Sequence, residues 1–109
     1  MILANAAGVA QSGEIEPFTD LRVHDLGPGL ADRTIAGESV PSRWRTAPLW
    51  GLSYRLRLES APTFLHDGRA RSIEEAILWH AGEADTARNN FEHLPDEQRQ
   101  HLLRWIEML

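Results

Sequence analysis

A short capped helix beginning near Ser72 is the sequence feature that most limits how this chain can fold. Residues 72–75 fit a capping box, in which the Ser72 hydroxyl accepts from the Glu75 amide and the Glu75 side chain reaches back to the Ser72 amide. Gly82 is a suitable stop for the helix. Four residues at i, i+3, i+4 and i+7 share one face: Ile73, Ala76, Ile77 and His80. The pattern predicts a helix whose core-facing stripe includes a histidine.

Two more amphipathic helices are predicted after it. The first covers about residues 85–93, with four apolar residues on one side: Ala84, Ala87, Phe91 and Leu94. Pro95 suits the first turn of the second, where Asp96 and Glu97 interact favourably with the helix dipole. Its apolar stripe is flanked by Trp105 and has four members: Leu102, Leu103, Ile106 and Leu109.

The chain before residue 72 lacks sustained periodicity, and its strand signals are weak. Residues 1–15 are expected to form a loose lead-in. Residues 16–41 are broken by six turn-favouring residues: Pro17, Gly27, Pro28, Gly29, Gly37 and Pro41. Residues 44–67 read as irregular yet rich in large side chains, which is typical of a loop that wraps something. We therefore expect one mainly α domain over residues 16–109, with long irregular loops followed by about three short helices.

Composition narrows the possible functions of these 109 residues. The net charge of −5 argues against a dedicated nucleic-acid binder, which needs a basic surface. The longest uncharged run, residues 1–13, is too short and polar to span a bilayer and lacks the pattern of a secretory signal. There is no cysteine, which excludes disulfides, thiolate metal sites and the C-x-x-C-H sequence that attaches a c-type haem. No G-x-S-x-G or phosphate-binding glycine motif is present.

His80 has two interpretations on the residues alone. A histidine on an apolar helical face is commonly a buried side chain that is hydrogen-bonded to a carbonyl. It is also how an iron ligand is presented, with one ring nitrogen on the metal and the other donating to an acceptor. The helical pattern is compatible with both.

Three segments resemble the C-terminal haem domain of the bacterial di-haem oxidoreductases. This peroxidase-like group is often labelled thiol oxidoreductase and is related to the di-haem cytochrome c peroxidases. The segments are FTDLRVHDLGPGLAD, WRTAPLWGL and FLHDGRARSIEEAILWHAGEA, and the resemblance runs from about residue 18 to residue 109. It implies a cytochrome c-like, mainly helical fold. In the related peroxidases, the side chain fourteen positions after the H-D-G histidine is the distal ligand of the C-terminal haem. That count leads from His66 to His80.

The resemblance also implies roles for the segment WRTAPLWGL. Five of its residues would belong to a loop that packs on the haem: Arg45, Thr46, Pro48, Leu49 and Trp50. Arg45 is a candidate propionate donor, and the alternative is a solvated surface arginine. Trp50 and Trp44 would otherwise be core anchors. The implied haem-binding set is therefore His80 as the metal ligand with Arg45, Pro48, Leu49, Trp50 and His66 around it.

The H-D-G motif itself predicts a turn. Asp67 is suited to bonding its own backbone and Gly68 supplies permissive dihedral angles, so the motif is expected to aim the following helix. His66 has no obvious acid–base partner nearby in the sequence, and we assign no catalytic residue. His24 also matches the family pattern, and it either packs against the haem region or supports its loop by hydrogen bonding.

The chain departs from the family in the cofactor attachment. The family domain normally begins with a helix carrying C-x-x-C-H, whose histidine is the proximal ligand, and complete members have an N-terminal haem domain as well. Neither is present, so covalent attachment of haem c is impossible and bound haem is an open question. The expectation is a partial cytochrome c-like domain that is not a competent enzyme alone.

Three functional interpretations remain open. The first is a truncated family member whose ancestral role is haem binding and electron transfer, and whose partner is the missing haem-bearing part or a redox protein. The second is a haem-free helical module that docks on a partner through exposed apolar side chains. The third is a non-functional gene fragment. The resemblance implies a periplasmic location, although no signal peptide is visible.

Overall fold

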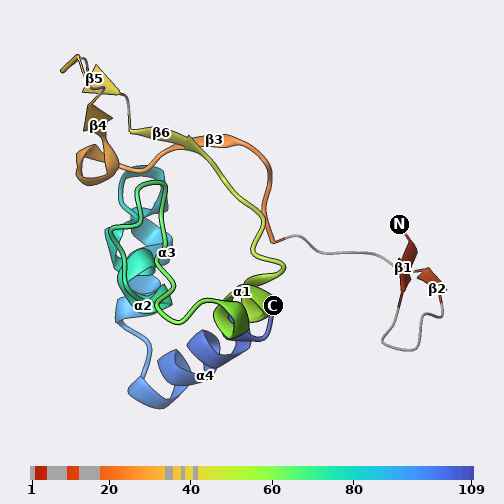
Figure 1. Cartoon of the computed structure of the whole chain (residues 1–109). Helices are drawn as coiled ribbons and strands as arrows, with labels where there is room; N and C mark the ends of the chain where they lie inside the picture. Colours follow the sequence, from red (N-terminus) through yellow and green to blue (C-terminus); the bar gives the residue numbers. More distant parts are fainter. Residues whose placement is uncertain (1, 5–9, 13–17, 34–35, 38, 41) are drawn as a thin grey trace.

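The computed structural model describes residues 2–4, 10–12, 18–33, 36–37, 39–40 and 42–109 (Figure 1). Within these residues the fold is mainly helical, which confirms the predicted class. Its four α-helices are α1 (Leu52–Leu58), α2 (Ile73–Trp79), α3 (Asp85–Glu92) and α4 (Asp96–Glu107). Two 3₁₀ turns accompany them, η1 (Pro28–Leu30) and η2 (Gly82–Ala84). No helix in the described part of the chain has the length and apolar character needed to cross a membrane.

Three short antiparallel strand pairs lie in the loop-rich part of the described chain. The pairs are β1 (Ile2–Ala4) with β2 (Ala10–Ser12), β3 (Val23–Asp25) with β6 (Arg43–Arg45), and β4 (Asp32–Arg33) with β5 (Ser39–Val40). The β1–β2 hairpin lies within the predicted lead-in, of which residues 1, 5–9 and 13–15 are outside the described residues. In the β3–β6 ladder His24 lies opposite Trp44. Figure 1 shows this ladder at the top of the view, above the helices.

Helix α2 begins as its sequence predicts but ends earlier. The Ser72 hydroxyl accepts from the Glu75 amide at 3.0 Å, whereas the Glu75 carboxylate accepts from the Arg71 amide at 2.8 Å instead of the Ser72 amide. The helix stops at Trp79, three residues before Gly82, and His80 is its C-cap with an extended ψ of 126°. The Ala81 amide donates to the Leu26 carbonyl at 3.1 Å. That contact with a distant segment replaces the next bond of the helix.

Helix α1 lies in the stretch of residues 44–67 that the sequence predicts to be irregular, and that prediction is wrong for residues 52–58. No side chain caps α1. Gly51 precedes it with φ +88°, a conformation that glycine adopts readily. The Gly51 amide donates to the Leu109 carbonyl at 2.7 Å, and α1 packs against α4. A contact with the far end of the described chain thus defines where this helix begins.

Helices α3 and α4 match their predicted positions, except that Pro95 is the N-cap of α4 and not part of its first turn. The fully packed core is small. Its buried apolar residues are Leu30, Phe64, Ala70, Phe91, Leu103 and Ile106. Helix α2 contributes no buried residue to this core. Its apolar stripe faces a cavity.

Candidate functional site

A cavity of about 1110 Å³ lies between the helices and the β3–β6 ladder. This volume is slightly above the roughly 300–1,000 Å³ of ordinary small-molecule sites. The predicted stripe of α2 faces it, with further apolar residues from α3 and α4: Ile73, Ala76, Ile77, Ala87, Phe91, Leu102 and Ile106. The loop after β6 supplies Pro48 and Leu49. The lining is predominantly apolar, so the cavity suits a large hydrophobic ligand.

His80 lies at the end of α2 and lines the cavity. Its Nδ1 is 2.7 Å from the Ala76 carbonyl oxygen. A carbonyl oxygen only accepts, so Nδ1 carries the hydrogen, and in the neutral ring Nε2 holds the free lone pair. Among the described residues the structure shows no hydrogen-bond partner for Nε2. This geometry satisfies a half-buried histidine and equally prepares the tautomer of a metal ligand.

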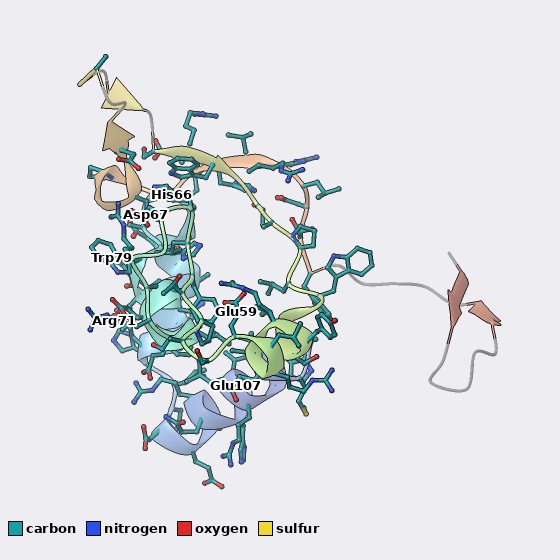
Figure 2. The ribbon with its side chains drawn as sticks, viewed as in Figure 1. Glu59, His66, Asp67, Arg71, Trp79 and Glu107 are labelled. Atoms are coloured by element: carbon teal, nitrogen blue, oxygen red, sulfur yellow. The ribbon has the colours of Figure 1, made fainter. Side chains whose placement is uncertain are left out.

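His66 lines the cavity near β4 (Figure 2). Its ring stacks on the indole of Trp44, with centroids 4.0 Å apart and an 18° angle between planes. Its Nε2 lies 3.1 Å from Asp32 Oδ2 and 3.8 Å from Asp67 Oδ2. Asp32 is a hydrogen-bonding partner of His66 that the sequence does not reveal, because the two residues are 34 positions apart.

The Asp32, His66 and Asp67 side chains are close enough together to hold a metal ion. Asp67, however, already forms an ion pair with Arg69 at 2.7 Å. The hydrogen bond from Arg69 is the main reason that the pKa of Asp67 is lowered to about 2. We therefore interpret this group as an ion-pair network that supports the H-D-G turn.

The predicted turn over the H-D-G motif is confirmed. Asp67 Oδ1 accepts from the Arg69 amide at 3.1 Å, and Gly68 has φ +74°. The Arg69 side chain then donates to the Gly29 carbonyl and lies over the Trp79 ring, with its guanidinium carbon 4.9 Å from the ring centroid. The turn thus links both ends of α2 to the η1 segment.

His24 has carboxylate partners at both ring nitrogens. Nε2 is 2.6 Å from Asp20 Oδ2, and Nδ1 is 3.4 Å from Glu83 Oε1. The hydrogen bond with Asp20 is the main reason that the pKa of His24 is raised, and Glu83 adds to the shift. His24, Asp20 and Glu83 all line the cavity. His24 therefore lines the cavity and supports its loop by hydrogen bonds, and its packing against haem stays a prediction.

Five of the six residues assigned to haem binding come together around the cavity: His80, Arg45, Pro48, Leu49 and His66. The sixth, Trp50, is not among the lining residues and is 47% exposed. Two further arginines, Arg55 and Arg88, do line it and were not singled out by the sequence. The Nε of Arg88 is buried and has no hydrogen-bond partner among the described residues. The signal available in the sequence was that Arg88 lies four residues after Ala84 and three before Phe91, which places it beside the predicted apolar face.

Comparison with known proteins finds one family. A family model described as "Di-haem oxidoreductase, putative peroxidase" matches residues 4–109, which is nearly the whole chain. A search of curated proteins and a search of solved structures each found no match. The family is di-haem, whereas these 109 residues contain no cysteine and so no C-x-x-C-H attachment sequence.

Proposed function

This chain belongs to the di-haem oxidoreductase family, and on that premise we propose that its cavity binds one haem without covalent attachment, with His80 as an axial ligand. The observation that carries the proposal is the hydrogen bond from His80 Nδ1 to the Ala76 carbonyl at 2.7 Å. It leaves Nε2 as the lone-pair nitrogen of a residue that lines a large apolar cavity. The proposed role is haem binding and electron transfer, in the periplasm as the family resemblance implies.

The cavity fits this cofactor in two respects, while the absence of cysteine restricts binding to non-covalent contacts. The volume and apolar lining suit the two faces of a porphyrin. Arg45, Arg55 and Arg88 supply cationic groups at the cavity wall, and arginine suits the carboxylates of the propionates.

The chain's own residues have separable tasks in this proposal. When bound, haem supplies an iron centre that exchanges single electrons. The Ala76 carbonyl orients the His80 ring by accepting the Nδ1 hydrogen. The apolar stripe of α2 keeps water away from the ring faces. His66 is already bonded to Asp32, so we assign it a structural role at the cavity edge.

A haem-free docking module is the second candidate. It is supported by large apolar side chains that are strongly exposed on α1 and just after α4. Tyr54, Leu58 and Met108 are 61%, 66% and 70% exposed. Exposed apolar side chains that gather in one patch are typical of an interaction site.

Titration with ferric haem separates the two candidates. His93 is the matched control for His80, because it is also a helix C-cap whose Nδ1 lies 2.7 Å from the carbonyl four residues earlier. It is exposed and is not among the residues that line the cavity. We expect a Soret shift at one haem per chain in the wild type and in His93→Ala, and loss of that spectrum in His80→Ala. No shift in the wild type, or the same spectrum in all three proteins, would overturn the proposal.

A further inference from the structure

We infer that the contact between β3 and the η2 turn fixes the position of His80 relative to the β3–β6 wall of the cavity. Gly82 and Glu83 are the positioning residues. The inference rests on the proposed function of His80 as a ligand. Residues 25–27, just at and after β3, meet residues 81–83, which directly follow His80. Because β3 and α2 belong to different walls of the cavity, this contact determines how far apart the walls lie.

The backbones approach so closely that side chains are excluded from both. The Ala81 amide donates to the Leu26 carbonyl at 3.1 Å. A Cβ at Gly82, which has φ +59°, would collide with the Asp25 carbonyl oxygen and lie 2.9 Å from the Gly27 nitrogen. A Cβ at Gly27 would lie 2.8 Å from Ala81 Cβ. Glycine at both positions therefore permits the contact.

Side chains then hold the two segments together. One oxygen of Glu83 accepts from the Asp25 amide, and the other is 3.4 Å from His24 Nδ1. His24 is in turn bonded to Asp20, so the imidazole lies between two carboxylates on different segments. Asp25 Oδ1 accepts from the Gly27 amide at 3.0 Å, which fixes the strand end that meets Gly82. Together these bonds tie β3 to the residue three positions after His80.

The early end of α2 is the visible effect of this contact. The sequence pattern alone continues the helix to Gly82, yet it stops at Trp79 because Ala81 bonds to Leu26 instead of to the helix. His80 is therefore the last residue before the chain is anchored to β3. Weakening the anchor would let the end of α2 move relative to the β3–β6 wall, and His80 would move with it.

Two variants test the inference, each with a matched control. Gly82→Ala forces the segments apart, and Gly37→Ala is its control, because Gly37 has a similar φ of +83° with nothing within 4 Å of its Cβ position. Glu83→Gln keeps the shape but removes the charge beside His24. Glu107→Gln is its control, on the exposed surface of α4 (Figure 2). Glu83→Gln also keeps the inference testable if Gly82→Ala does not fold.

The readouts are the NMR signals of the His80 ring in the haem-free protein and the affinity for ferric haem. We expect both test variants to shift the His80 ring signals and to weaken haem binding at least tenfold, while the far-ultraviolet circular dichroism is retained. Neither control variant should shift the His80 signals or weaken haem binding. Unchanged His80 signals in both test variants would overturn the inference. If the wild type binds no haem, the proposed function fails, and the His80 signals alone still decide whether the contact positions this side chain.

Discussion

The imidazole of His66 lies flat against the indole of Trp44, with 4.0 Å between ring centroids and 18° between planes. Trp44 is in β6, and His66 is in the H-D-G turn before α2. The Trp44 indole nitrogen also donates to the carbonyl of Leu30, a residue only 1% exposed, at 3.0 Å. This one side chain therefore connects the ladder, the η1 segment and the H-D-G turn.

Replacing Trp44 by alanine should destabilise the domain by about 3 kcal/mol, the lower end of the range for large aromatic truncations, since the side chain is only half-buried. Trp44→Phe keeps a stacking surface but loses the bond to Leu30 and should cost about 1 kcal/mol. Urea unfolding followed by circular dichroism measures both. Trp50→Ala is the control and should cost well under 1 kcal/mol. Equal losses for Trp44→Ala and Trp50→Ala would contradict the connecting role of Trp44.

The helices after residue 72 could be predicted because their signals are local. Ser72 caps α2 within its own first turn, and Pro95, Asp96 and Glu97 mark the start of α4. Helix α1 carries no such signal. Its start depends on a bond from Gly51 to Leu109, which no pattern within the helix reveals.

The candidate site divides in the same way. The place of His80 at the cavity wall could be predicted from helical spacing within one short segment, and its role as a ligand stays a prediction. Asp20 lies only four positions from His24, but each of the other two cavity histidines also has a partner that is distant in the sequence. Asp32 is 34 positions from His66, and Glu83 is 59 positions from His24. Such pairs form only when loops close, so periodicity and capping carry no information about them.

Acid should lower the free energy of unfolding of the domain by protonating Asp67. Its pKa is lowered to about 2, mainly by the hydrogen bond from Arg69, so folding favours the charged carboxylate. The resulting stabilisation is complete above the ordinary pKa of 3.8 and is lost as the pH falls from there to about 2. Asp67→Asn removes the charge but retains a side-chain carbonyl. Measured between pH 5 and 2, the free energy of unfolding should fall more steeply in the wild type than in Asp67→Asn. Parallel curves would show that Asp67 is not linked to folding.

The pKa of His24 should lie above 6.5 in an NMR titration of the folded protein, because Asp20 and then Glu83 stabilise the charged ring. Since the folded pKa is raised, this stabilisation is complete below pH 6.5 and is lost as the pH rises through the folded value. Asp20→Asn should lower the pKa of His24 more than Glu83→Gln does, because the hydrogen bond with Asp20 has the larger effect. A pKa at or below 6.5 in the wild type would show that the two carboxylates do not stabilise the charged His24 ring.

Arg88 should bind a propionate if the cavity binds haem. Its Nε is buried without a hydrogen-bond partner among the described residues, although Glu92 Oε1 lies 3.9 Å from it, and Asp85 lies 3.2 Å from Nη2. A hydrogen bond to a charged group contributes about 1.5–3 kcal/mol, so Arg88→Gln should weaken haem binding about tenfold. The control Arg104→Gln, on the exposed side of α4, should leave affinity unchanged.

The dimethyl ester of haem makes this last test specific to the propionates. Esterification removes the carboxylate charges, so the wild type should bind the ester more weakly than it binds haem, whereas Arg88→Gln should discriminate less between them. The binding free energy that the wild type loses on esterification, minus the loss in Arg88→Gln, gives the coupling energy between the arginine and the propionate carboxylate. If wild type and Arg88→Gln lose the same affinity on esterification, the propionates do not contact Arg88. The cavity would then hold the ring in another orientation, with Arg45 or Arg55 as the next side chains to substitute.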